Sequence, residues 1–262
     1  MEADRTRIVQ AIQTLAAKVL AASPAGQQLH LIGGFRYRLL NASCRASADI
    51  DYHWEGDLDA KQAQIVDVLR KRLLPEVKRQ YAYEGDVRPA TGPGADSPAV
   101  RIVELAFFRP AEAGSRIELP IEITTIARLD PPLVRTVEGT VFLTVSDADM
   151  IESKIVALVN RTFPRVRDAL DVFLFQDALP ANARERLSRK LMALALRNAD
   201  IVARLDALEA NRTVHEREMA RLLDEQVEPA VAANLRAAGG AAMIFETVMR
   251  LLRDVLQKGP RS

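Results

Sequence analysis

Leu31-Ile32-Gly33-Gly34-Phe35 is followed, a short distance along the chain, by Ser47-Ala48-Asp49-Ile50-Asp51. Residues 29–32 are mainly apolar and predict a short β-strand that ends at the two glycines, and residues 35–40 are expected to form a helix. Residues 48–54 alternate, with Ile50 and Tyr52 on one face and Asp49 and Asp51 on the other, which predicts a second strand. Strand, diglycine, helix and an aspartate-bearing strand therefore follow one another in this order.

The two aspartates are the first candidates for a metal site. Side chains two residues apart on a strand project from one face, roughly 6–7 Å apart along it. Two such carboxylates repel each other unless a cation lies between them, and Mg²⁺ is the expected cation because it prefers hard oxygen ligands and bridges phosphates. A third carboxylate is expected from a neighbouring strand. Glu122, in Pro120-Ile121-Glu122-Ile123, is the candidate, and Glu118 on the same face is its rival.

The diglycine suits the approach of a phosphate. Gly33 and Gly34 have no Cβ, so the chain can turn sharply and come close to a ligand, and the helix that follows offers free amides to an anion. Candidate nucleotide contacts close to them are Arg36 and Arg38 on this helix and the Ser47 hydroxyl. Taken singly, Asp-x-Asp is usually a solvated strand face and Gly-Gly a turn. Their combination and order point to a site.

Composition sets broad limits. The chain has 262 residues, 48% hydrophobic and 27% charged, which suits one large folded domain or two modest ones. A net charge of +1 does not indicate a strongly basic nucleic-acid binder, although a local basic patch stays open. Cys44 is the single cysteine, so no disulfide forms within the chain. No signal peptide or membrane-spanning stretch is recognised, and a cytoplasmic protein without membrane contact is expected.

The chain changes character near residue 146. Helices are expected over residues 3–22 and 59–79, and strands over 100–108, 117–126 and 140–145. From Ser146, a suitable helix cap, helices are expected over 147–160, 165–177, 181–193, 196–209, 213–224 and 228–257. The prediction is an α+β fold in two domains: a mixed sheet flanked by helices over residues 1–145, and an all-helical C-terminal domain over residues 146–262.

A second block of sequence joins the first. It comprises Glu152-Ser153-Lys154-Ile155-Val156-Ala157-Leu158, then Arg161, then Arg167-Asp168-Ala169-Leu170-Asp171. Together, the two blocks resemble the AbiEii/AbiGii-type toxin family of nucleotidyltransferases, in order and spacing, from about residue 30 to about residue 175. The helical tail is similar only in general character. The resemblance implies a nucleotidyltransferase fold of the DNA polymerase β-like type, followed by a helical domain.

The resemblance also implies a function. Family members are toxins of toxin–antitoxin or phage-defence systems, and some transfer a nucleoside monophosphate from a nucleoside triphosphate to the 3′ end of tRNA. By position, Asp49 and Asp51 would hold magnesium, and Glu122 is expected to join them as the third carboxylate. Lys154 would contact the nucleotide phosphates with Arg161, and Asp168 and Asp171 would complete the catalytic site from the helical domain. A cleft between the domains, an RNA acceptor and a cognate antitoxin protein are expected on the same basis.

Two departures and several alternatives stay open. Phe35 stands where a small or hydroxylated residue is usual, and Glu122 replaces a more common aspartate, so the choice of nucleotide is open. The charges around Lys154 suit phosphate binding, with Arg161, Arg165 and Arg167 nearby, but ordinary salt bridges on a surface helix have the same pattern. The alternative functions are modification of a small molecule such as an antibiotic or of a protein, and an inactive nucleotide- or RNA-binding module.

Overall fold

The computed structural model describes residues 2–91, 99–110, 112 and 114–257. The chain forms two compact units. The first comprises the chain up to Ile126 together with Pro132–Val145, and the second comprises Ala127–Pro131 and the chain from Ser146 onward. The segment Ala127–Pro131 thus groups with the helical unit, although its sequence lies between two strands of the first unit.

The first unit is built on a seven-stranded mixed sheet. Its strands are β1 His30–Ile32, β2 Ile50–His53, β3 Glu84–Pro89, β4 Val100–Phe108, β5 Ile117–Thr124, β6 Leu133–Val137 and β7 Thr140–Thr144. They lie in the order β3-β4-β5-β2-β1-β7-β6. β2 is parallel to β5 and β1 is parallel to β7, whereas the other neighbours are antiparallel. This order places β2 at the centre of the sheet.

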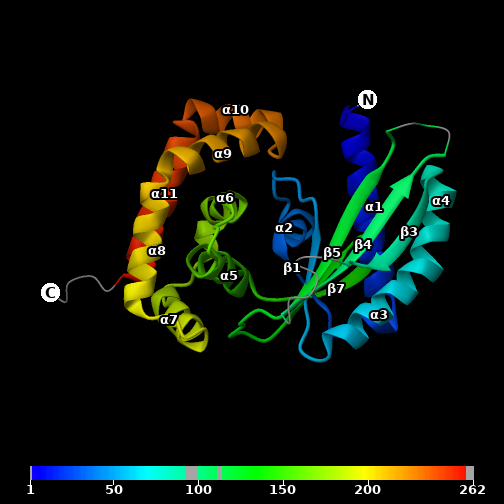
Figure 1. Cartoon of the computed structure of the whole chain (residues 1–262), viewed down its shortest axis with the longest axis horizontal. Coiled ribbons are helices and arrows are strands. Elements are labelled where there is room, and N and C mark those ends of the chain that lie inside the picture. The colour runs from blue at the N-terminus through cyan, green and yellow to red at the C-terminus, as the bar shows by residue number, and fades with distance from the viewer. Residues whose placement is uncertain (1, 92–98, 111, 113, 258–262) are drawn as a thin grey trace. The chain divides into compact units, whose positions relative to one another are not determined.

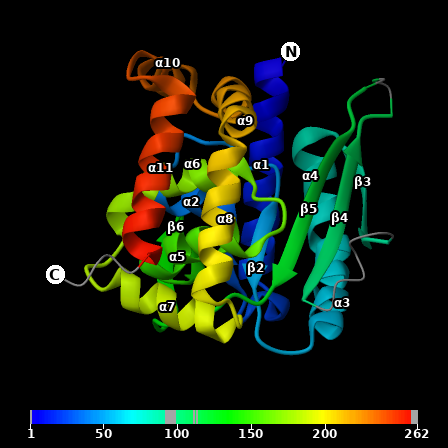
Figure 2. The same cartoon turned by 60° about the vertical axis from the view of Figure 1, so that its left-hand side comes forward.

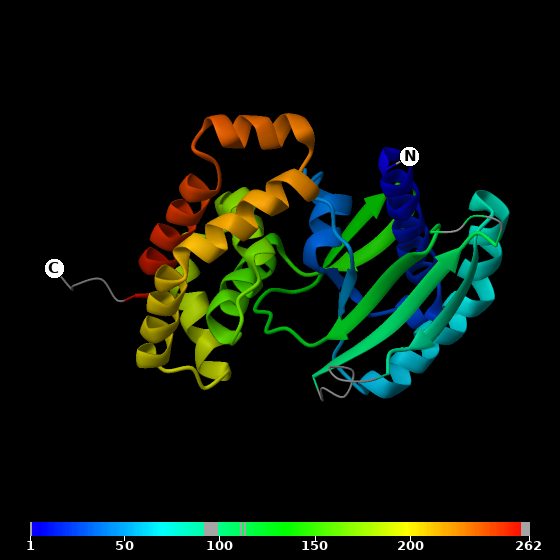
Figure 3. The same ribbon diagram turned by 45° about the horizontal axis from the view of Figure 1, so that its top comes forward.

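Helices flank this sheet (Figure 1). They are α1 Glu2–Ala21, the short η1 Pro24–Gly26, α2 Gly33–Asn41, α3 Leu58–Val68, η2 Leu69–Leu73 and α4 Leu74–Tyr81. α3 and α4 run along the outer strands β3 and β4, as Figure 3 shows, and α1 packs near α3 and β7. α2 follows β1 directly and contacts β2. The expected mixed sheet flanked by helices is therefore confirmed.

The core of this unit explains why β2 presents its aspartates. Ile50 and Tyr52 are buried in one cluster with Ile121 and Ile123 of β5 and with the apolar sides of α1 and α3. Successive side chains of a strand point to opposite faces, so burying these residues turns the intervening acidic residues to the other face. The apolar alternation thus fixes which residues are available for chemistry.

The helix expected over residues 59–79 runs from Leu58 to Tyr81, with a π-helical turn at Leu69–Leu73. Pro75 lies in the first turn of α4 and has no amide hydrogen to donate. A π turn just before it accommodates this loss within a continuous helical segment. Leu69 and Leu73 are both fully buried in the core.

The second unit is helical. It contains α5 Asp147–Asn160, α6 Val166–Phe175, η3 Gln176–Ala178, α7 Ala183–Ala193, α8 Asn198–Ala210, α9 Arg212–Glu225, α10 Pro229–Ala237 and α11 Gly240–Leu256. Ser146 caps α5, accepting the Asp149 amide at 2.9 Å. α11 packs against α6, α7, α8 and α9, and Figure 2 shows it beside α8. The expected helical C-terminal region is confirmed.

The single helix expected over residues 228–257 is wrong. The chain breaks between α10 and α11, where Gly239 and Gly240 have φ angles of +120° and +62°. These are backbone conformations that L side chains rarely adopt, and they end a right-handed helix. The apolar periodicity continues on both sides of the break, so it did not reveal the interruption. Among the described helices, none is both long enough and apolar enough to cross a bilayer.

Candidate active site

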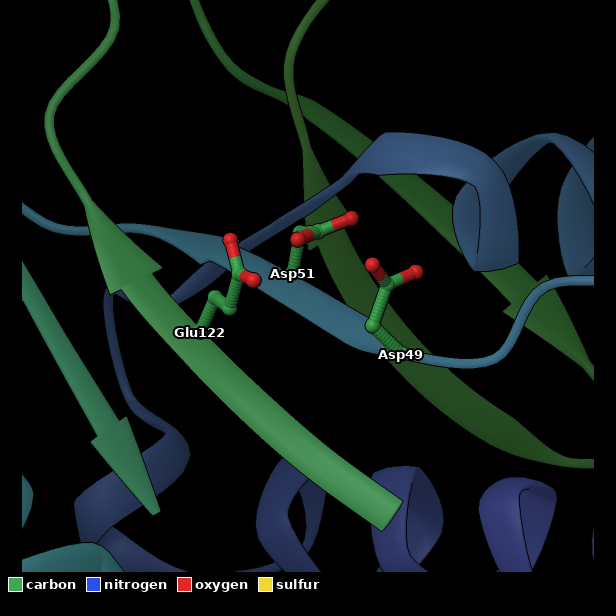
Figure 4. Close-up of side chains that lie close together, drawn as sticks. All are labelled: Asp49, Asp51 and Glu122. Atoms are coloured by element: carbon green, nitrogen blue, oxygen red, sulfur yellow. The ribbon is translucent and has the colours of Figure 1, made fainter. Parts of the chain in front are cut away.

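Three carboxylates converge on the face of the sheet opposite its packed core. Asp49 lies immediately before β2, Asp51 lies within it, and Glu122 lies on the neighbouring β5, where its Cα is paired with that of Asp51. One carboxylate oxygen from each residue lies within 4.8 Å of the others. Figure 4 shows the three side chains rising together from the two strands. This group, called the acidic triad below, could hold a metal ion.

Glu118 is placed differently from its rival. It lies four residues before Glu122 on β5, roughly 13 Å away along the strand. Its exposed side chain forms a salt bridge with Arg116, with 2.7 Å between Nε and Oε1. The parallel pairing of β2 with β5 brings Glu122, and not Glu118, beside Asp51. The geometry therefore favours Glu122 as the third carboxylate.

The diglycine lies directly against this triad. Gly33 has a φ angle of +76°, and a Cβ added to it would lie 1.8 Å from Oδ2 of Asp51. A Cβ on Gly34 would lie 2.3 Å from an Arg45 guanidinium nitrogen and 2.9 Å from the Ser47 hydroxyl. Both glycines are therefore required for the first turn of α2 to approach the acidic strand.

A matched pair of glycines tests this close approach. Gly33→Ala and Gly139→Ala impose the same strained backbone, since both positions have φ +76°, but nothing lies within 4 Å of a Cβ at Gly139. We expect the nucleotide-transfer activity of Gly33→Ala to be at least about tenfold lower than that of Gly139→Ala. The part of the stability loss that comes from backbone strain should be similar in the two variants. Activity assays and thermal melts of both variants measure the difference. Equal activities would show that the approach of Gly33 to Asp51 is unimportant.

Ser47 and Asp49 form a fixed unit. The Ser47 hydroxyl donates to Oδ1 of Asp49 at 2.8 Å, and the Gln13 side chain holds the Ser47 carbonyl at 2.8 Å. Ser47 and Asp49 are both buried. In this structure Ser47 orients a carboxylate of the acidic triad, in addition to lying close to Gly34. It remains a predicted nucleotide contact.

Arg36, Arg38 and Phe35 lie on α2 in distinct surroundings. Arg36 is fully buried and donates to Asn41 at 2.6 Å, to the Thr144 hydroxyl at 3.0 Å and to the Val145 carbonyl at 3.3 Å. This favours a structural role over the predicted nucleotide contact, since it ties α2 to β7. Arg38 is half-buried. The Phe35 ring packs in the apolar core, so the bulk of this side chain does not occupy the space beside the diglycine.

Arg45 is a candidate that the sequence pattern did not single out. Its side chain is almost completely buried, and Nη1 donates to the Ala46 carbonyl at 2.9 Å. The Nη2 atom of the same guanidinium group lies next to Gly34. A positive group beside the N-terminal turn of a helix is suited to an anion that contacts both. The sequence signal for Arg45 was its position two residues before Ser47, which itself lies two residues before Asp49.

The second unit gathers four of the other predicted site residues. Lys154 of α5 lies 2.7 Å from Oδ1 of Asp168 and 3.0 Å from Oδ2 of Asp171, both on α6. Arg161 lies 2.6 Å from the other oxygen of Asp168. Both aspartates are buried. These four residues, the lysine cluster, therefore form a compact charged group and not a set of separate surface charges.

Opposing effects set the charge state of Asp168. Burial alone would raise the pKa of its carboxyl, but Lys154, Arg161 and Arg167 together lower this pKa below its ordinary value. A carboxyl with a depressed folded-state pKa stabilises the fold above the unfolded-state pKa of about 3.9, and this contribution is lost as the pH falls. Asp168 is therefore ionised at neutral pH.

Lys154→Met tests this balance. The variant lacks the Lys154 ammonium group, which is the strongest influence that lowers the pKa of Asp168. Burial, which raises this pKa, is then less offset, so we expect the pKa of Asp168 to rise. Because the folded state then holds this proton more tightly, stability should fall less steeply than in the wild type as the pH drops below about 4. Carboxylate NMR titration and acid unfolding measure the two effects. An unchanged Asp168 titration would exclude Lys154 as the main compensating charge.

A further charge network occupies the base of α5. Lys190 of α7 lies 2.7 Å from Asp149 and 2.8 Å from Glu152, all three buried. Arg186 contacts Glu152 at 2.5 Å and Asp130 at 2.8 Å. Asp149 also accepts the backbone amides of residues 129 and 130, at 2.9 and 3.0 Å. This network, called the α5–α7 network below, anchors the crossing segment Ala127–Pro131 in the helical unit.

Comparison with solved structures shows the fold of the chain. JHP933 from Helicobacter pylori is similar over 96% of this chain and 93% of its own, with 16% identity and a TM-score of 0.51. MenT4, a nucleotidyltransferase toxin from Mycobacterium tuberculosis H37Rv, is similar over 69% of this chain and 62% of its own, with 14% identity and a TM-score of 0.50. At these identities the likeness establishes a nucleotidyltransferase fold. Among curated proteins, none matches the sequence significantly.

The sequence itself matches one family over nearly its whole length. The family described as nucleotidyl transferase AbiEii toxin, type IV TA system, covers residues 13–250. This span includes the acidic triad, the diglycine and the lysine cluster. The chain belongs to the AbiEii family of nucleotidyltransferase toxins.

Proposed function

We propose that this chain transfers a nucleoside monophosphate from a nucleoside triphosphate to the 3′-hydroxyl of an RNA, with tRNA as the favoured acceptor. The acidic triad beside the diglycine carries the proposal, because hard oxygen ligands next to a phosphate-accepting helix start are what phosphoryl transfer requires. The RNA acceptor is inferred from the family resemblance of the sequence, and the basic side chains near Lys154 are compatible with it.

Mg²⁺ is the proposed metal. The triad offers only carboxylate oxygens, and their separation of up to 4.8 Å is close to the roughly 4.2 Å between opposite ligands of an octahedral magnesium site. Asp49, Asp51 and Glu122 would hold it, with Ser47 keeping Asp49 in place. When bound, the metal would neutralise negative charge on the phosphates and on the leaving pyrophosphate.

The triphosphate is proposed to lie along the first turn of α2. Gly33 and Gly34 leave room for it, and Arg45 and Ser47 border the same turn. Because Arg36 is engaged by Asn41 and β7, Arg45 is the better placed arginine for this cradle.

The substitution Arg45→Lys would keep the positive charge and lose the planar guanidinium group. Steady-state kinetics should therefore show a larger rise in KM for the nucleotide than change in kcat.

In the proposed reaction the acceptor hydroxyl oxygen bonds to the α-phosphorus, and the bond from this phosphorus to the bridging oxygen breaks. Pyrophosphate leaves with that electron pair, and the hydroxyl proton passes to Glu122, the triad carboxylate on β5. Lys154 and Arg161 are proposed phosphate contacts, and Asp168 and Asp171 are proposed to complete the site. Their mutual salt bridges would hold both aspartate side chains in place.

A cognate antitoxin and a cytoplasmic location complete the proposal. Both are supported by membership of a toxin family of type IV toxin–antitoxin systems. The acceptor, the nucleotide base and the antitoxin are the parts that need direct measurement.

Incubation of the protein with each labelled NTP, Mg²⁺ and total RNA tests the proposal. We expect one NTP to label a band of tRNA size, and EDTA to abolish the label. Label in a protein band or on a small molecule, such as an antibiotic added to the mixture, would identify a different acceptor class. No label with any acceptor, despite nucleotide binding, would support an inactive binding module.

A further inference from the structure

The loop between α5 and α6 carries the most exposed large apolar side chain among the described residues. Phe163 is 85% exposed, and Met192 follows at 66%. Arg161, Arg165 and Arg167 lie close to Phe163 in the sequence, and no acidic residue occurs from 160 to 167. Asp168 follows directly and pairs with Arg161, so the three arginines and this aspartate leave a local net charge of +2 beside the exposed aromatic ring.

The backbone of this loop is restricted at Phe163. Pro164 follows Phe163 and restricts its backbone to extended conformations. Less conformational freedom then remains to be lost when a ligand binds to the ring. Single exposed apolar residues are common on protein surfaces, so exposure alone carries no conclusion. The restricted backbone and the flanking arginines distinguish Phe163 from the others.

A hollow of about 270 Å³ opens beside the loop. Arg165 and Arg167, at the start of α6, and Arg221 of α9 supply hydrogen-bond donors to its wall, whereas Glu218 and Glu225 supply acceptors. Arg221 is paired with Glu225 at 2.7 Å. A mixture of donors and acceptors suits a ligand that has phosphates and also hydroxyl or amino groups. Ribonucleotides have all of these groups.

We infer that the Phe163 loop and this hollow form a binding surface for single-stranded RNA, with one base stacked on Phe163 and adjacent phosphates on Arg165 and Arg167. Proteins that bind single strands combine aromatic platforms with a basic groove. The inference rests on the proposed RNA acceptor and specifies the surface that receives it. Arg161 links this surface to the lysine cluster through its salt bridge with Asp168.

Binding to labelled single-stranded RNA ending in CCA tests the surface. Fluorescence anisotropy is measured with the full chain carrying Asp51→Asn, so that transfer does not alter the probe. Phe163→Ala should weaken binding about 5- to 150-fold, the range expected when one base no longer stacks. Phe163→Trp should restore it. Phe108→Ala is the matched control, because Phe108 is the other exposed phenylalanine among the described residues, at 41%, and lies in the first unit.

The salt dependence separates stacking from charge. Arg165→Ala should reduce the slope of log K against log salt by about 0.7 for each phosphate that the side chain no longer neutralises, whereas Phe163→Ala should leave the slope unchanged. Unchanged RNA affinity in Phe163→Ala, or failure of Phe163→Trp to restore affinity, would overturn the inference.

The proposed function and this inference can fail separately. Transfer of label is measured with the wild-type chain, and RNA affinity with the Asp51→Asn background. RNA labelling by the wild type with no loss of affinity in Phe163→Ala would refute the surface alone. Absence of labelling in the wild type, with weakened RNA binding in Phe163→Ala, would refute the transfer reaction and support the surface. Melting temperatures should not change, because Phe163 is exposed.

Discussion

Asp51→Asn is expected to lower nucleotide transfer by about 1000-fold or more. The substitution keeps the shape of the side chain and removes one negative charge from a triad whose oxygens lie within 4.8 Å of one another. A metal contributes several kcal/mol to phosphoryl transfer, and a thousandfold loss corresponds to about 4 kcal/mol. Rates of incorporation from a labelled NTP, with the wild type and the variant at equal concentration, measure the effect.

Metal binding should fall with activity in this variant. Binding of Mn²⁺, followed by electron paramagnetic resonance, reports the triad without requiring turnover. Glu118→Gln is the matched control, since it removes a carboxylate from the same strand as Glu122 but outside the triad. Its activity and Mn²⁺ binding should remain close to those of the wild type. Equal losses in both variants would contradict a specific role for the triad.

Lys190→Met is expected to produce the largest loss of stability. Lys190 is buried between Asp149 and Glu152, which are themselves fully buried. Methionine fills a similar volume but leaves these two carboxylates with less compensation. Removing one member of a buried ionic group usually costs about 3–5 kcal/mol because an uncompensated charge remains buried. Urea unfolding followed by circular dichroism measures the change in free energy of unfolding.

Two comparisons isolate the charge effect. Lys71→Met removes an exposed lysine that pairs with Asp67 at 2.7 Å, and it should change stability by less than about 1 kcal/mol. Adding Glu152→Gln to Lys190→Met should recover part of the loss, since one uncompensated charge is then removed. A double variant as unstable as the single one would show that packing of the lysine side chain, and not charge, is responsible.

The central parts of the fold follow from the sequence. Ile50 and Tyr52 alternate with Asp49 and Asp51, and burial of the apolar pair is enough to place both aspartates on the other face. The same alternation places Glu122 correctly on β5. Only the pairing of β2 with β5 distinguishes Glu122 from Glu118, because it fixes the register between two strands far apart in sequence.

The two strands that the sequence did not reveal, β3 and β6, lie at the edges of the sheet. β3 buries only Val87 and ends at Pro89, and β6 follows Pro131 and Pro132 and has mainly exposed side chains. Edge strands pair on one side and need little apolar alternation, so their local signal is weak. Their partners, β4 and β7, were predicted because each carries a buried face.

Charged residues were harder to place than apolar ones. The lysine cluster and the α5–α7 network consist of residue types that usually cover exposed helices, and only the tertiary packing of α5 with α6 and α7 buries them. Arg36 and Arg45 illustrate the same limit. Both are arginines near the diglycine, but Arg36 is held by Asn41 and Thr144, whereas Arg45 lies against Gly34. Sequence spacing does not separate these environments.

The crossing segment Ala127–Pro131 has a consequence for the order of synthesis. It reaches the ribosome exit before β6 and β7, yet Arg186 and Lys190, to which the α5–α7 network ties it, are translated more than fifty residues later. At about 5–20 residues per second, this delay lasts a few seconds. The sheet can thus be completed while the segment still lacks its cationic partners. A gene divided after residue 145 would place Asp130 and Arg186 on different polypeptides, so the helical fragment alone would lack a segment that its own charge network contacts.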